Sequence, residues 1–298
     1  MAHASASDNL SHPNWGTSSV KVFEGQVLRK YAIIVYNMKA ELCLFLAFAA
    51  LLRMTSLAGT DRKSGETKVI TLPGGATMEM VWCAPGKFPM GSPETESGRF
   101  NDETQREVTL TKGFWIGKYE VTQRQWVSVM RTNPSRFKDA DAPVDDISWH
   151  DCKTFIRKVN AEIGGCARLP TEAEWEYACR AGDIGSIAGT GVLDDMAWYD
   201  FNSENQTHPV GGKKPNAWGI YDMHGNVLEW CSDWYSTGAT TAIADPKGPP
   251  SGSFKVLRGG CWFFYERDCR SAYRLKREPN SRNCIYGFRL ACTDMADL

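Results

Sequence analysis

Short runs of alternating apolar and polar residues near the start of the globular region predict strands rather than helices. Residues 69–72 and 78–82 are two such runs, and the Pro73–Gly75 segment between them is typical of a β-hairpin turn. Further short strands are predicted at residues 87–91, 108–110 and 114–118. The pattern therefore indicates small sheets built from short strands.

Three helices follow, and a capping box marks each of them. In this motif a Ser or Thr side chain accepts a hydrogen bond from the backbone N–H three positions later. The side chain of that later residue accepts one from the backbone N–H of the Ser or Thr. The pairs are Thr122 with Gln125, Ser148 with Asp151, and Thr171 with Glu174. Apolar residues at helical spacing follow each pair, so we interpret these faces as core. The third helix is expected to end at Gly182, and only loops and short strands are expected after it.

The C-terminal stretch over residues 256–291 has two regular ends and an irregular middle. Positions with the pattern of buried strands are Val256, Leu257, Phe288 and Leu290. Glycines expected to form turns are Gly259, Gly260 and Gly287. The aromatic and charged residues between these ends follow neither the strand nor the helix period. Such residues on irregular backbone between fixed strands are typical of a binding surface, so we predict the functional site here.

The N-terminal residues 1–66 are predicted to form a leader and a linker before a globular domain over residues 67–298. Met38 and Lys39 precede an apolar run of roughly a dozen residues, which is typical of a secretory signal and shorter than a membrane span. If translation starts at Met38, the protein is exported to the cell surface or the extracellular space. The alternative is an internal apolar helix. Membrane attachment through the signal or an anchor stays open.

Composition excludes several classes of function. The formal net charge is −1 and the chain has no long basic run, so a nucleic-acid partner is not expected. Apolar residues make up 42% of the chain, which is enough for a packed core. The ten cysteines form no CxxC pair, and the five histidines show no HxxxH or HExxH spacing, so zinc-finger and histidine-cluster metal sites are not expected. The cysteine spacings leave disulfide pairing open.

Several blocks of the chain resemble the formylglycine-generating enzyme, or sulfatase-modifying factor, family. The blocks lie in the family's order at residues 114–123, 144–152, 168–178 and 216–230, with Arg258-Gly-Gly and Gly287-Phe-Arg near the end. The resemblance covers roughly residues 68–298. It implies an α+β fold, the variant C-type lectin fold of this family, with few helices, small antiparallel sheets and much irregular structure.

The same resemblance raises the question of catalysis. In the enzymes of the family, two cysteines five residues apart bind copper and oxidise a sulfatase cysteine. Aligned on Arg258, the second falls on Cys269, but the first falls on Phe264. Phenylalanine can neither bind a soft metal nor form a thiolate, and Cys261 lies eight residues from Cys269. We therefore predict no catalysis and no required cofactor. The alternatives are an oxidase acting on protein cysteines and a lectin-like domain with one fixed ligand.

The C-terminal stretch also resembles the variable region of retroelement-diversified proteins of the treponemal variable protein type, which are bacterial. The resemblance implies a variable region over about residues 258–291, in which randomised adenines turn asparagine codons into many others. Its frame residues, which resemble fixed positions, are Arg258, Gly259, Gly260, Trp262, Arg270, Ser271, Ala272, Arg274, Gly287, Phe288 and Arg289. The predicted ligand-binding residues are Trp262, Phe263, Phe264, Tyr265, Arg267, Asp268, Tyr273, Leu275, Arg277, Ser281, Asn283, Cys284, Ile285 and Tyr286.

The expected partner is an unknown protein or surface ligand. Trp262, Phe263, Phe264, Tyr265, Tyr273 and Tyr286 are predicted to anchor it, with charge selectivity from Arg267, Asp268 and Arg277. The family resemblance further implies a structural calcium site at Asp222, Gly225, Val227 and Glu229, a set of hard oxygen ligands. The alternative is that Asp222 and Glu229 only cap loops or pair with arginines.

Overall fold

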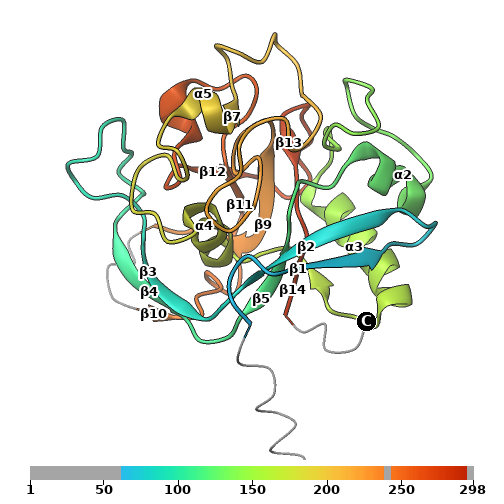
Figure 1. Ribbon diagram of the computed structural model, residues 1–298, viewed down its shortest axis with the longest axis horizontal. Coiled ribbons are helices and arrows are strands. Elements are labelled where there is room, and N and C mark those ends of the chain that lie inside the picture. The colour runs from blue at the N-terminus through green and yellow to red at the C-terminus, as the bar shows by residue number, and fades with distance from the viewer. Residues whose placement is uncertain (1–61, 238–242, 294–298) are drawn as a thin grey trace, which may run out of the picture. The chain divides into compact units, whose positions relative to one another are not determined.

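A computed structural model describes residues 62–237 and 243–293 (Figure 1). The largest sheet has the strand order β1-β2-β5-β14-β6. Its strands are β1 (Thr67–Thr71), β2 (Thr77–Cys83), β5 (Phe114–Gly117), β14 (Ala291–Cys292) and β6 (Ala167–Arg168). The predicted hairpin is confirmed, because β1 pairs antiparallel with β2 and Ile70 lies opposite Met78.

Three smaller sheets complete the domain, with the orders β10-β4-β3, β12-β11-β9-β13 and β7-β8. Their strands are β3 (Gly86–Met90), β4 (Arg106–Leu110), β7 (Ala197–Trp198), β8 (His224–Gly225), β9 (Leu228–Trp234), β10 (Ile243–Ala244), β11 (Lys255–Arg258), β12 (Arg274–Arg277) and β13 (Tyr286–Gly287). Most pairs are antiparallel, whereas β13 runs parallel to β9. The irregular middle of the C-terminal stretch contains a short strand, β12, that the sequence pattern did not predict. Phe288 and Leu290, predicted as buried strand positions, are buried but lie between β13 and β14.

The three predicted helices are confirmed, and each capping box forms as expected. The helices are α2 (Gln123–Met130), α3 (Trp149–Ile163) and α4 (Glu172–Arg180), followed by the short α5 (Leu193–Met196) and the 3-10 turn η1 (Glu266–Cys269). At the end of α4, Ala181 takes the left-handed conformation with φ 47° and Gly182 follows it in the same region of φ. The chain thus leaves the helix one residue earlier than predicted.

Helix α4 is buried on nearly all sides, which its apolar stripe did not predict. Trp175 is fully buried as expected, but Glu172, Glu176 and Arg180 are also buried. Buried charges are stable only when they are paired and hydrogen-bonded. Glu172 and Glu176 pair with arginines of the C-terminal stretch, whereas Arg180 pairs with Glu176 and donates to the carbonyls of Gly91 and Gly185.

Other expectations are corrected or lie outside the described residues. Gly287 is part of β13 rather than a turn; a Cβ there would lie 2.6 Å from a methyl carbon of Val227, so close packing requires the glycine. Residues 62–66, predicted as linker, contact the domain, because Gly65 donates its N–H to the Trp82 carbonyl. The predicted signal at Met38 is outside the described residues, and within those residues no helix has the length and apolarity to cross a membrane.

Candidate functional site

Within the C-terminal stretch, two glycines follow directly after strand β11. Gly259 and Gly260 take φ values of 103° and 75°, which side-chain-bearing residues rarely adopt. A Cβ on Gly260 would also lie 2.6 Å from the Cys269 sulfur. After this turn the chain passes through η1 and returns along β12, which pairs antiparallel with β11 (Figure 1). In this register the backbone of Arg274 lies opposite that of Arg258.

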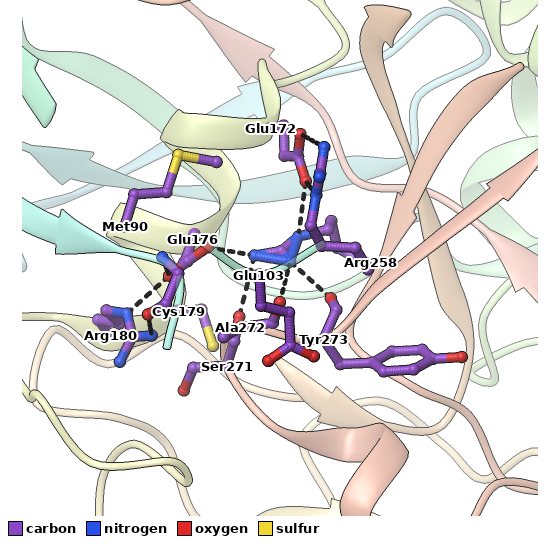
Figure 2. A network of polar contacts seen from close by, with 12 residues as sticks. Met90, Glu103, Glu172, Glu176, Cys179, Arg180, Arg258, Ser271, Ala272 and Tyr273 are labelled. Atoms are coloured by element: carbon purple, nitrogen blue, oxygen red, sulfur yellow. Dashed lines mark hydrogen bonds and ion pairs between the residues drawn. The ribbon is translucent and has the colours of Figure 1, made fainter. Parts of the chain in front are cut away.

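Arg258 is the centre of the polar network beneath this return segment (Figure 2). Its guanidinium is fully buried and donates to the backbone carbonyls of Ser271, Ala272 and Tyr273. The same group forms ion pairs with Glu176 and Glu172 of α4. One side chain therefore fixes the backbone of the return segment to the charged face of the helix.

Two further arginines of the frame hold the same segment from either end. Arg270 donates to both oxygens of Glu103 at 2.7 and 2.8 Å and to Glu96 at 2.7 Å. Arg274 donates to both oxygens of Glu172 at 2.5 and 2.8 Å. Burial alone would raise the pKa of Glu172, but Arg274 and Arg258 lower it below its usual value. Buried arginine–glutamate pairs, each with more than one hydrogen bond, therefore hold the frame in place.

Most of the predicted ligand-binding residues lie on the outer side of this frame. Phe263 and Tyr265 have exposed fractions of 56% and 65%. The others with an accessible side chain are exposed (Arg267, Arg277 and Asn283) or half-buried (Phe264, Asp268, Leu275, Ser281, Cys284 and Ile285). We call these eleven residues the displayed positions.

Three of the predicted anchors are buried, which corrects the expectation that they offer contact area. The Trp262 indole donates to the Cys284 carbonyl at 3.1 Å. Tyr273 packs edge-on against half-buried Phe264, with ring centroids 6.0 Å apart. Tyr286 belongs to the core and accepts a hydrogen bond from Arg277 at 2.9 Å. These three residues form a floor beneath the displayed positions.

Residues outside the C-terminal stretch also border the site, and the sequence pattern did not single them out. Phe137 packs edge-on against Trp262 with ring centroids 5.6 Å apart, and Phe100 packs similarly against Tyr273. The Asp200 N–H donates to the carbonyl of Phe264 at 3.0 Å, which brings the loop after β7 to the site. Isolated aromatic residues in loops carry no periodic signal, so only the tertiary structure could find them.

The cysteines of the site are poor candidates for the family's copper chemistry. Cys261 and Cys269 are both fully buried. Burial raises the pKa of Cys269 to about 12 and that of Cys261 well above its usual value. Both side chains therefore favour the protonated thiol, whereas the form that binds a metal is the thiolate. Nearby His224 is held in the neutral form: its Nε2 accepts from the Ala188 N–H, and burial lowers its pKa to about 4. Within residues 62–237 and 243–293, no group of three or more His, Cys, Asp or Glu side chains is placed to hold a metal.

The four predicted calcium ligands do not fit a calcium ion in this arrangement. Both oxygens of Glu229 accept from Arg289, at 2.6 and 2.7 Å, and one also accepts from the Trp175 indole. A cation bound to Glu229 would have to displace this guanidinium. The contacts of Glu229 agree with the alternative prediction of an arginine pair. Asp222 accepts only the Gly211 N–H, and its second oxygen is buried without a partner among the described residues.

Replacing Asp222 with asparagine is expected to stabilise the protein above about pH 6. Burial raises the pKa of Asp222 to about 6, so in the folded state ionisation costs free energy. This cost is absent below about pH 4, the usual range of the carboxyl, and grows as pH rises through about 6. Asparagine tolerates the φ of 56° and keeps an acceptor for Gly211.

Urea unfolding from pH 4 to pH 8 measures this effect. The free energy of unfolding of Asp222→Asn should exceed that of the native chain by about 1 to 3 kcal/mol at pH 8 and should equal it at pH 4. Asp141→Asn, at a side chain with an exposed fraction of 64%, serves as the control. Stabilisation of the native chain by added calcium, lost in Asp222→Asn, would contradict the prediction and favour a calcium site.

Comparisons with known proteins agree with the fold. The family model for the sulfatase-modifying factor enzyme 1-like domain matches residues 66–294. A chaperone protein LppX of Paenibacillus barcinonensis is 32% identical over 253 residues, covering 67% of this chain and 86% of the relative. A formylglycine-generating enzyme of Streptomyces coelicolor is 36% identical over 178 residues, covering 52% of this chain and 54% of the enzyme.

Among solved structures, Treponema denticola variable protein 1 superposes with a TM-score of 0.71 and 31% identity. The match covers 76% of this chain and 99% of that protein. Both resemblances read from the sequence are therefore confirmed, as is the α+β, variant C-type lectin fold that they implied. The chain belongs to the family of sulfatase-modifying factor enzyme 1-like domains.

Proposed function

We propose that this protein is a surface-displayed, non-catalytic binding protein whose C-terminal variable region forms a diversified ligand site. One observation carries the proposal: within the region, frame arginines are fixed by buried charge pairs, whereas the displayed positions are exposed or half-buried. The likeness to Treponema denticola variable protein 1 supports it. A site that tolerates many side chains needs a backbone whose position does not depend on them, and the three arginines supply this.

On this proposal, the displayed aromatic residues provide the contact area. Phe263 and Tyr265 are large, rigid side chains that lose little conformational entropy on binding. Arg267, Asp268 and Arg277 add charges of both signs, which would give charge selectivity. An aromatic patch left exposed on a single chain is typical of an interaction site.

Alanine substitutions at two tyrosines distinguish a displayed position from a residue of the buried floor. Tyr265→Ala is expected to change the free energy of unfolding by less than about 0.5 kcal/mol, because its side chain is exposed. Tyr286→Ala should cost about 3 to 5 kcal/mol, because it removes a ring from the core. Chemical denaturation of both variants measures the difference. Equal costs at the two positions would contradict the division between displayed positions and floor.

Diversification itself is tested in the neighbouring DNA. The proposal requires a reverse transcriptase gene beside an adenine-rich near-repeat of the segment that encodes residues 258–291. Sequences of this segment from several isolates should differ at the displayed positions and agree at Arg258, Arg270 and Arg274. An unchanging segment would favour the alternative of one fixed ligand.

Export is part of the proposal and has one structural support. Cys166 and Cys292 form a disulfide that joins the segment before β6 to β14. Disulfides persist mainly in oxidising compartments, such as the cell surface and the extracellular space. The other seven described cysteines are free, and six of them are buried.

A second candidate function is oxidation of protein cysteines. It is favoured by the 36% identity to a formylglycine-generating enzyme, although the chain spans about half of that enzyme. The buried thiols of Cys261 and Cys269 and the phenylalanine at position 264 weigh against it. Copper binding by the purified protein, together with conversion of a Cys-x-Pro-x-Arg peptide seen by mass spectrometry, would establish it.

A further inference from the structure

A loop outside the C-terminal stretch is attached directly to the displayed positions. The loop follows β7 and runs over residues 199–204. Its Asp200 N–H donates to the Phe264 carbonyl at 3.0 Å, and its Ser203 hydroxyl donates to the Trp262 carbonyl at 2.7 Å. Ser203 is fully buried, so the attachment is part of the packed structure. The position of this loop is therefore fixed relative to the displayed positions.

The same loop carries the most exposed large hydrophobic side chain among the described residues. Phe201 has an exposed fraction of 85%, more than Phe263 or Tyr265. It lies between Asp200 and Asn202, whose contacts hold the loop, since Asn202 donates to the Ala197 carbonyl at 3.0 Å. Phe201 is therefore an exposed phenylalanine on a loop whose neighbouring residues are held in place.

The charged residues within the loop, Asp200 and Glu204, are acidic, whereas Lys213 lies over the ring of Trp198, just before the loop. Asp200, Glu204 and Glu266 are exposed, and none has an ion-pair partner among residues 62–237 and 243–293. Tyr199 of the same loop donates its hydroxyl to Asp194 at 2.8 Å, and burial, this hydrogen bond and the charges of Asp194 and Glu266 raise the pKa of Tyr199 to about 12. The adjacent cation, Arg267, turns toward Phe100 and Asp268 instead. Unpaired carboxylates beside exposed aromatic rings complement cationic groups with aliphatic stems, such as lysine and arginine side chains.

We propose that the loop over residues 199–204 is a fixed part of the binding site and directs it toward basic, partly apolar protein segments. The inference rests on the proposed function, because the displayed positions supply the other half of the surface. In this arrangement Phe201, Asp200 and Glu204 give every diversified version of the site a constant preference for cationic segments. The displayed positions then select among those segments.

Peptide binding tests this inference. The probes are two fluorescein-labelled peptides of equal length, one alternating lysine with leucine and the other alternating glutamate with leucine, at about 0.15 M salt. Fluorescence anisotropy with the full chain should show at least about tenfold tighter binding of the lysine peptide. Phe201→Ala should weaken that binding about tenfold, and the double change Asp200→Lys with Glu204→Lys should reverse the preference. Both variants should unfold like the native chain, because the changed side chains are exposed.

Two sets of controls make each outcome decisive. Val69→Ala, at an exposed position on β1, should leave binding unchanged; an equal loss there would mean non-specific adhesion and overturn the inference. Equal affinity for the two peptides, or an unchanged affinity in Phe201→Ala, would also overturn it. If Phe263→Ala and Tyr265→Ala weaken binding while Phe201→Ala does not, the proposed function stands and only the role of the loop fails. If only Phe201→Ala weakens binding, the variable region is not the site and the proposed function fails.

Discussion

Replacing Arg258 with methionine is expected to destabilise the domain by about 3 to 5 kcal/mol. Methionine approximates the length of the side chain but leaves the carbonyls of Ser271, Ala272 and Tyr273 without their donor. It also leaves a buried oxygen of Glu176 unpaired. Removing one partner from a buried charge pair costs far more than the pair itself contributes, because the remaining charge stays desolvated. Chemical denaturation measures the loss.

The matched control is Arg124→Met. Arg124 also forms an ion pair, with Asp141 at 2.9 Å, but both side chains are more than 60% exposed. Such surface pairs contribute about 0 to 1 kcal/mol, so the free energy of unfolding of this variant should stay close to that of the native chain. Hydrogen exchange should in addition accelerate at residues 271–274 in Arg258→Met only. Similar unfolding free energies for the two variants would show that the Arg258 network does not hold the frame.

Removing the Cys166–Cys292 disulfide is expected to cost about 2 to 5 kcal/mol. The two cysteines are 126 residues apart, so the bond closes a long loop in the unfolded chain. It also holds the C-terminal strand β14 beside β6, its antiparallel neighbour in the largest sheet. The double variant Cys166→Ser with Cys292→Ser should therefore unfold at a clearly lower denaturant concentration. In a reductant, the native chain should unfold at the same denaturant concentration as the double variant.

Cys284→Ser is the control for this effect, because Cys284 is a free, half-buried cysteine at a displayed position. Its unfolding free energy should differ from that of the native chain by less than about 0.5 kcal/mol. If a reductant leaves the stability of the native chain unchanged, the bond does not form in solution. The structural support for export would then be lost.

Some parts of the fold could be predicted because their causes are local. A capping box needs two residues three positions apart, so the start of each helix could be identified from the chain at Thr122, Ser148 and Thr171. Turns at Gly259 and Gly260 were predictable for the same reason, since only glycine adopts their φ values readily. The frame residues were recognised through resemblance, and each of them is buried or half-buried in the structure.

The sequence by itself determined where the helices and the hairpin form, which family the chain resembles, and which stretch carries the candidate site. Only the tertiary structure decided which aromatics of that stretch are accessible: Tyr265 projects outward, whereas Tyr286 is buried against Trp230. It also decided the partners of Arg258, because Glu176 is 82 residues away in the sequence. The physical reason is range. Local hydrogen bonds and backbone preferences act within a few residues, but burial and charge pairing depend on segments that only the complete fold brings together.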